Sequence, residues 1–98
     1  MDKILETISA IIETYEGGHY KDLHGMHRAL VCNMYYLSQK QVEYHQKWNE
    51  QYYKSEEKSN AAKERECDKN VPELYLCRKI METAKGVSIA MSLEIKMN

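Results

Sequence analysis

The sequence predicts an all-α fold: a long antiparallel helical hairpin with an additional N-terminal amphipathic helix, forming a single domain over residues 1–98. Three observations support this prediction. Apolar residues recur at steps of three and four, the spacing that places them on one face of a helix. The chain has one Pro and four Gly, so few positions interrupt a helix. The clearest breaks, at Gly17-Gly18 and at Pro72, divide the chain into three helical segments.

The first expected helix covers about residues 2–16. Asp2 is a suitable N-cap, and the apolar residues that follow it share one face: Ile4, Leu5, Ile8, Ile11, Ile12 and Tyr15. Gly17-Gly18 then supply the left-handed conformation that ends many helices. A helix this short is marginal on its own, so another helix or another subunit must cover its isoleucines.

The second expected helix is long, from about residue 20 to residue 69, with Asp22 as a candidate N-cap. If it were helical throughout, it would extend roughly 75 Å. One stripe of side chains recurs at alternating steps of three and four: Leu23, Met26 and His27, Leu30, Met34, Leu37, Gln41, Tyr44, Trp48, and Gln51 and Tyr52. The stripe is apolar in its first half and aromatic in its second. It predicts a seam against another helix, because a helix draws most of its stability from packing.

The third expected helix covers about residues 71–96. Asn70 and Glu73 have the spacing of a capping box, and Pro72 is tolerated only in a first turn. A short turn here predicts that this helix folds back antiparallel on the long one. Apolar residues surround its C-terminal part on nearly every side, which predicts a homo-oligomer. The expected interface comprises Ile8, Ile12, Val87, Met91, Leu93 and Ile95.

Charge and cysteine content restrict the function classes. Fourteen basic and fifteen acidic residues give a formal net charge of -1, so the chain has no overall electrostatic preference for nucleic acid or an anionic membrane. Three cysteines at unrelated spacings within helical patterns favour a reducing compartment. The acidic N-terminus is unlike a signal peptide, and no apolar run has membrane-spanning length. We therefore expect a cytoplasmic protein without a membrane partner.

The sequence contains no motif for catalysis or for a cofactor. A metal site near His19, His24 and His27 would need further convergent ligands, and the nearest cysteine, Cys32, is not at a standard spacing. These histidines are better interpreted as exposed or packed side chains near a helix start. No glycine-rich phosphate loop or zinc-ribbon spacing is present. We expect a protein that is not an enzyme and that uses no metal and no cofactor.

The polar segment 54–69 and the aromatic residues before it allow two interpretations. The charge run is either a solvated helix end or a binding face, and the former agrees better with its mixed signs. Tyrosines interleaved with lysines could stack bases and pair phosphates, as in single-strand binders, or they could fill the helix seam. The four-residue repeat of Tyr44, Trp48 and Tyr52 favours the seam. Tyr36 and Tyr53 are then the candidates for an external contact.

Two short patterns mark the last expected helix: Glu73-Leu74-Tyr75 followed by Arg78-Lys79, and Val87 followed by Ala90-Met91. With the charged segment before them, they resemble small tailed-phage proteins over roughly Val42 to Lys96. The layout is similar to the recombination mediator proteins of T4-like phages, helical oligomers that assist strand-exchange proteins on single-stranded DNA. The resemblance implies an accessory protein for DNA recombination or replication. The expected phosphate-facing residues are Lys47, Lys54, Lys58, Lys63 and Arg65.

The near-neutral charge departs from a mediator-like pattern and argues against direct DNA binding. A second class of function fits the same residues. Small neutral or acidic helical phage proteins often inhibit a host defence system, either by docking on one of its proteins or by sequestering its nucleotide signal within an oligomer. Such an inhibitor needs a rigid scaffold and exposed aromatic anchors. A purely structural coiled-coil adaptor is a third interpretation.

Overall fold

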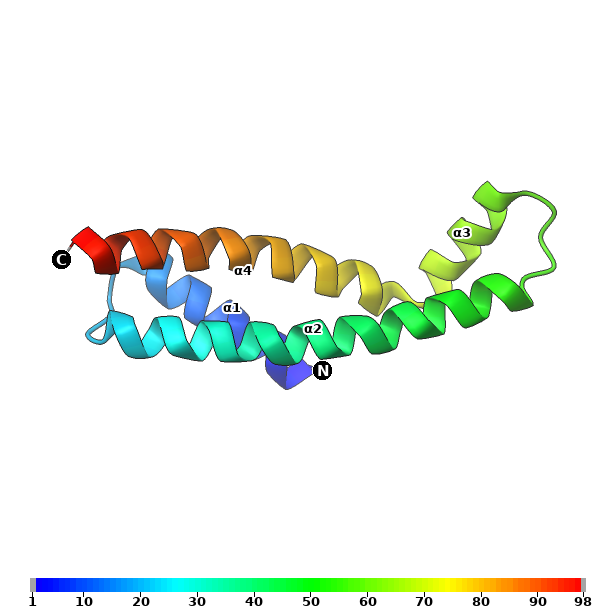
Figure 1. Ribbon diagram of the computed structural model, residues 1–98. Coiled ribbons are helices and arrows are strands. Elements are labelled where there is room, and N and C mark those ends of the chain that lie inside the picture. Colours follow the sequence, from blue (N-terminus) through cyan, green and yellow to red (C-terminus); the bar gives the residue numbers. More distant parts are fainter. Residues whose placement is uncertain (1, 98) are drawn as a thin grey trace.

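The computed structural model describes residues 2–97, the side chain of Asp2 excepted, and this part of the chain forms four helices and no strand. The helices are α1 (Asp2–Gly17), α2 (Leu23–Lys54), α3 (Asn60–Asn70) and α4 (Pro72–Met97). They form an elongated body of 56 × 20 × 19 Å, with α2 and α4 side by side along its length (Figure 1). The predicted all-α fold class is confirmed.

The hairpin consists of α2 and α4. The Tyr20 hydroxyl, just before α2, bonds to both carboxylate oxygens of Glu94, at 2.8 and 2.9 Å. His27 Nε2 lies 3.2 Å from Ser88 Oγ. Because the later residue in one helix pairs with the earlier residue in the other, the two helices run antiparallel. Their buried seam contains Leu30, Leu37, Cys77, Met81, Ala84 and Met91.

The N-terminal helix α1 lies across the hairpin and packs against both α2 and α4 (Figure 1). Its predicted apolar face points inward, and Ile8 and Ile12 are buried in the same core as the hairpin seam. The helix ends at Gly17. Gly18 follows with a φ of 73°, the left-handed conformation that glycine adopts without a steric penalty, and its N–H donates to the Tyr15 carbonyl at 3.1 Å.

Asp22 caps α2, as the sequence predicted. Its side chain accepts a hydrogen bond of 2.9 Å from the Gly25 N–H. A Cβ at Gly25 would collide with the Asp22 carboxylate. The glycine therefore makes room for the cap, which explains why α2 begins at Leu23 although glycine is a poor helix former.

The prediction of one helix from about residue 20 to residue 69 is wrong at residues 55–59. Ser55 has an extended backbone (φ -65°, ψ 133°) and terminates α2. Ser59 is the N-cap of α3, and its hydroxyl accepts a hydrogen bond of 3.1 Å from the Ala62 N–H. Serine hydroxyls compete with the helical hydrogen bonds for backbone groups, so two serines four residues apart can end one helix and begin another.

Apolar burial explains why this break occurs. If α2 continued to residue 69, a short turn would place the start of α4 against the polar segment 54–69. Because α3 instead folds back over the end of α2, α4 lies beside Leu30 and Leu37 (Figure 1). Full burial of one such side chain contributes about 1.5–3 kcal/mol. This is more than the helical stability that is lost because the few exposed residues 55–59 are not helical.

The predicted capping box at the start of α4 is also wrong. Asn70 is the last residue of α3, and its Nδ2 donates to Gln51 Oε1 at 3.5 Å. Pro72 does occupy the first position of α4, as predicted. The corner between α3 and α4 is held instead by Val71, whose N–H donates to the Cys67 carbonyl at 2.8 Å and whose side chain is buried.

Candidate functional site

The polar tip, which we define as the last part of α2 from Tyr44, the loop 55–59 and α3, holds most of the predicted contact residues. Its centre is an aromatic pair. The rings of Trp48 and Tyr52 stack with centroids 5.6 Å apart and an interplanar angle of 16°. Trp48 Nε1 donates to Asp68 at 2.9 Å, and the Tyr52 hydroxyl donates to Asn60 Oδ1 at 3.0 Å. Tyr44 packs against the hydrophobic core. The three aromatics therefore belong to the helix seam.

The Ser55 hydroxyl makes one hydrogen bond to α3 and one within the loop. The Ser55 hydroxyl donates to Glu66 at 2.5 Å and accepts from the Glu57 N–H at 3.3 Å. Two apolar side chains of the α3 region are buried, Cys67 and Val71. The tip is thus held mainly by side-chain hydrogen bonds near solvent, each of which contributes about 0.5–1.5 kcal/mol net.

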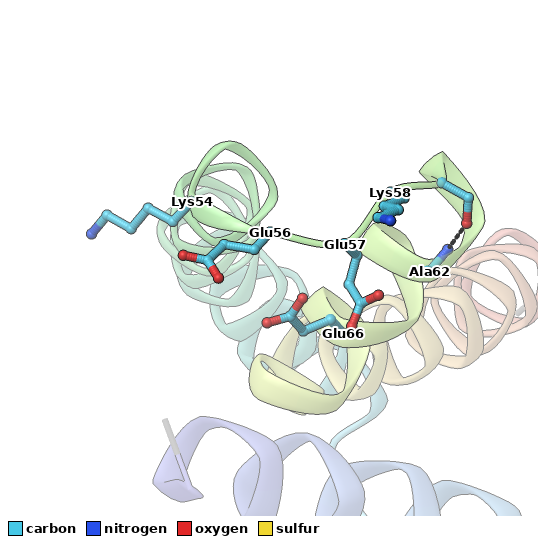
Figure 2. A pocket seen from close by; sticks show the side chains of 7 residues that line it. Lys54, Glu56, Glu57, Lys58, Ala62 and Glu66 are labelled. Carbon is cyan, nitrogen blue, oxygen red and sulfur yellow. Dashed lines mark hydrogen bonds between the residues drawn. The ribbon is translucent and has the colours of Figure 1, made fainter.

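An open hollow of about 650 Å³ lies between the loop and α3. Its lining includes Lys54 and Lys58, two of the predicted phosphate-facing residues, but also Glu56, Glu57 and Glu66. Figure 2 shows Lys54 extending away from Glu57 and Glu66. Three carboxylates and two ammonium groups give this hollow a negative formal charge, which disfavours a phosphodiester chain at neutral pH.

The remaining predicted cations are engaged within the chain. Lys47 Nζ lies 5.2 Å from the centroid of the Tyr44 ring, and Lys63 Nζ lies 5.5 Å from that of Tyr52. Arg65 Nε donates to the carbonyl of Ala61, one turn earlier, at 3.4 Å. These contacts are exposed and weak, so a ligand could displace them. They do not, however, bring the five basic residues together as one patch.

The two predicted aromatic contacts are both solvent-exposed but lie apart. Tyr53 is 87 % exposed at the end of α2. Tyr36 is exposed near the middle of α2, where it makes an edge contact with Tyr35 at a centroid distance of 5.9 Å. Seventeen residues of helix, about 26 Å, separate the two tyrosines. They cannot stack neighbouring bases of one short ligand.

Three of the six predicted interface residues are part of the chain's own core. Ile8, Ile12 and Met91 are buried by α1, α2 and α4 of the same molecule, so they are not available to a second copy. The physical reason is that α1 packs on the hairpin seam, where the prediction placed a second subunit. Val87 and Ile95 are half-buried, and Leu93 is 56 % exposed. Leu93 therefore remains the strongest member of that set.

Sequence reasoning missed a cluster at the elbow between α1 and α2. The rings of Tyr15 and Tyr20 stack with centroids 5.5 Å apart. The Tyr20 hydroxyl donates a hydrogen bond to the carboxylate of Glu94 in α4. The hydrogen bond to Glu94, together with burial, raises the pKa of Tyr20 above its ordinary value of 10.0. The pKa of Tyr15 is also raised, chiefly by burial and to a smaller extent by the Glu94 carboxylate. The pairing spans 74 residues, which no local pattern could reveal.

Two observations bear on metal binding and on the reactivity of the buried thiols. Within residues 2–97, no group of three or more His, Cys, Asp or Glu side chains is arranged to hold a metal ion. Burial raises the pKa of both Cys67 and Cys77, with nearby carboxylates adding to the effect, so neither thiol is activated as a nucleophile. What the site offers chemically is contact surface and charge.

Across the helices described here, none is long and apolar enough to cross a membrane. Comparisons with protein-family models, with curated proteins and with solved structures found no match.

Proposed function

We propose that this chain is a non-enzymatic helical protein that forms a homo-oligomer and acts in the host cytoplasm by binding a partner. The observation that carries the proposal is the exposed apolar end of α4. Ile89, Leu93 and Met97 all lie within the last nine residues of this helix, and Met97 is 85 % exposed. A group of exposed apolar side chains favours contact with another protein surface, because their contact with water is unfavourable.

The sequence resemblance suggests two roles for such an oligomer. The first is a phage accessory protein that assists DNA recombination or replication, with single-stranded DNA as a ligand. The second is a phage inhibitor of a host defence system that docks on a protein or sequesters a nucleotide signal within the oligomer. The carboxylates among the lysines of the polar tip support the second role. The phosphodiester chain of single-stranded DNA would be repelled by Glu56, Glu57 and Glu66. A protein surface with mixed charges avoids that repulsion.

Native mass spectrometry of the protein taken directly from cells tests these roles. The inhibitor role predicts an oligomer that carries a small nucleotide or a host protein and ignores added single-stranded oligonucleotide. Uptake of the oligonucleotide that weakens steeply with salt would favour the recombination role instead. A bare monomer at cellular concentration would refute both roles.

Leu93→Asp tests the α4 end. We expect it to lower the mass measured by light scattering while the helical circular dichroism signal is retained, since Leu93 is exposed within the chain. Thr83→Asp is the matched control, because Thr83 is an exposed residue of the same helix and bonds only to the Lys79 carbonyl one turn earlier. Equal masses for the two variants would exclude this end as the interface.

A further inference from the structure

The side of α2 that faces away from the core carries a second stripe of residues. Its members follow one another at alternating steps of four and three, the heptad spacing of a helix–helix seam, and every one of them is exposed. They are Arg28, Cys32, Tyr35, Gln39, Val42, Gln46, Asn49 and Tyr53. We call this set the outer stripe. Helices α1 and α4 pack on another side of α2, around Leu30 and Leu37, and α3 contacts the end of α2 at Trp48 and Tyr52. Within residues 2–97, the stripe residues are thus left exposed.

The outer stripe is poor in charge where its apolar exposure is greatest. Between Arg28 and Lys40, eleven consecutive residues of α2 carry no charge on any face. In the same segment Tyr35 is 60 % exposed, and Val42 just beyond it is 58 % exposed. Depletion of charge together with enrichment in tyrosine distinguishes the centre of a protein interface from ordinary surface. An exposed helix with no partner would more often carry charges at these positions.

The surface is also shaped for a facing helix. An open hollow of about 520 Å³ lies over the second half of the stripe and is lined only by α2 residues: Ser38, Gln41, Val42, His45, Gln46 and Asn49. None of these residues is Asp, Glu, Lys or Arg, so a neighbouring backbone can approach closely without desolvating the charge of such a side chain.

We propose that a second copy of this chain packs its own α2 on the outer stripe, antiparallel, about a two-fold axis at the level of Leu37. An axis between Lys40 and Gln41 would pair all eight stripe residues but would set Arg28 against Tyr53. The axis at Leu37 pairs six of them and brings Arg28 beside Glu43 and Glu50. It places Tyr35 opposite Gln39 of the second copy, Cys32 opposite Val42, and Arg28 opposite Gln46. Each contact occurs twice because the interface is symmetric.

Charge complementarity selects this orientation. Glu43 and Glu50 lie three residues before and four residues after Gln46, so they flank it on the helix surface. In the antiparallel register Arg28 therefore enters between two carboxylates of the second copy, at both ends of the interface. A parallel, in-register pair would instead place Arg28 against Arg28 of the other chain. Like charges in contact disfavour that alternative.

The outer stripe is distinct from the α4 end on which the proposed function rests. If both surfaces are used, the two-fold contact through α2 joins assemblies formed through α4. The two can be separated experimentally: Leu93→Asp should leave the α2 contact intact, and a change in the outer stripe should leave the α4 contact intact.

Cross-linking tests the register. Val42→Cys in the otherwise unchanged protein places a new thiol opposite the native, exposed Cys32 of the second copy. With a short bis-maleimide under dilute, native conditions, we expect a covalent dimer with two bridges. The unchanged protein and the Cys32→Ser/Val42→Cys variant are controls and should stay largely uncrosslinked. Efficient cross-linking through Cys32 alone would show a parallel or shifted contact, and no dimer in any variant would refute the interface.

A charge exchange tests the same interface without cysteines. Arg28→Glu should weaken dimerisation in analytical ultracentrifugation by at least about tenfold, because the introduced carboxylate would then face two carboxylates of the second copy. Adding Glu43→Arg and Glu50→Arg to that variant should restore association. Arg65→Glu, an exposed change outside the stripe, is the control. If Arg28→Glu associates as the unchanged protein does, or if the triple variant fails to recover while remaining helical, the proposed register is wrong.

Discussion

The two ends of this molecule are held together by different forces. At the apolar end, α1 and the facing halves of α2 and α4 share one core that includes Ile8, Leu30 and Met91, all fully buried. At the polar tip, α3 is attached to α2 by hydrogen bonds such as those of Trp48 with Asp68 and Ser55 with Glu66. Apolar burial is the larger and more cooperative contribution, so the apolar end sets the global stability. We therefore expect the tip to open while the hairpin stays folded.

Large effects are expected at the apolar end, and the first comes from a cavity. Leu37→Ala should lower the free energy of unfolding by about 2–5 kcal/mol, because Leu37 is fully buried between helices. Urea titration followed by circular dichroism measures this. Leu37→Met conserves volume and should lose less than about 1.5 kcal/mol. Equal losses for the two variants would show that the core is not close-packed at this position.

The same reasoning revises the expectation for Ile12. Its side chain belongs to the core, so Ile12→Asp should unfold the chain rather than dissociate a folded oligomer. A folded monomeric Ile12→Asp variant, judged by an unchanged helical circular dichroism spectrum and a reduced mass, would contradict the placement of α1 across the hairpin.

An intermediate effect is expected at the start of α2. Asp22→Ala removes the N-cap and should lower the free energy of unfolding by about 1 kcal/mol. In that background, Gly25→Ala should stabilise the protein by up to about 1 kcal/mol, since alanine is the better helix former and the collision with the carboxylate is gone. With Asp22 present, the same change should gain less. Additive effects in this double-mutant cycle would mean that the cap and the glycine are independent.

A smaller and more local effect is expected at the polar tip. Trp48→Phe keeps an aromatic ring but removes the Nε1–H donor to Asp68, so it should weaken the attachment of α3 by about 0.5–1 kcal/mol. The midpoint of global unfolding should hardly move. Hydrogen exchange of α3 should accelerate while that of residues 30–37 stays constant. A shift in the global midpoint comparable to that of Leu37→Ala would abolish the distinction between the two ends.

The smallest effect concerns alkaline pH. The pKa of Tyr20 is raised in the folded state, chiefly by its hydrogen bond to Glu94, so the folded chain holds this proton more tightly than the unfolded chain. The corresponding stability is complete below the unfolded pKa of about 10 and is lost as pH rises through the folded pKa. Stability should therefore fall more steeply above pH 10 in the unchanged protein than in Tyr20→Phe. Identical pH profiles from pH 9 to 12 would contradict this assignment.

Local patterns in the sequence predicted the elements well wherever one force acted alone. The isoleucine face of α1, the Asp22 cap and Pro72 at the first position of α4 each depend on residues within a single helix or its cap. The break at Ser55 was not predictable in this way, because residues 54–69 are compatible with helix. It follows from a competition between helix continuation and the burial of distant residues such as Met81 and Leu37, which only the three-dimensional register decides.

The candidate site was predicted less completely for a similar reason. Exposure of Tyr53 and Leu93 could be anticipated, because neither fits the core stripe of its helix. Ile8 of α1 and Met91 of α4 are buried in one shared core. Their burial depends on how α1 crosses the hairpin, which local sequence patterns do not specify. The carboxylates that surround Lys54 and Lys58 likewise come together only because α3 folds back.

Hydrogen exchange measured by mass spectrometry on the intact protein tests the contrast between the two ends most directly. We expect amides in residues 60–70 to exchange through local opening, with an opening free energy well below that of global unfolding. Amides in residues 30–37 and 77–91 should exchange only when the whole chain unfolds. Uniform protection across α3 and the apolar end would contradict this account, because it would mean that the tip and the core unfold as one unit.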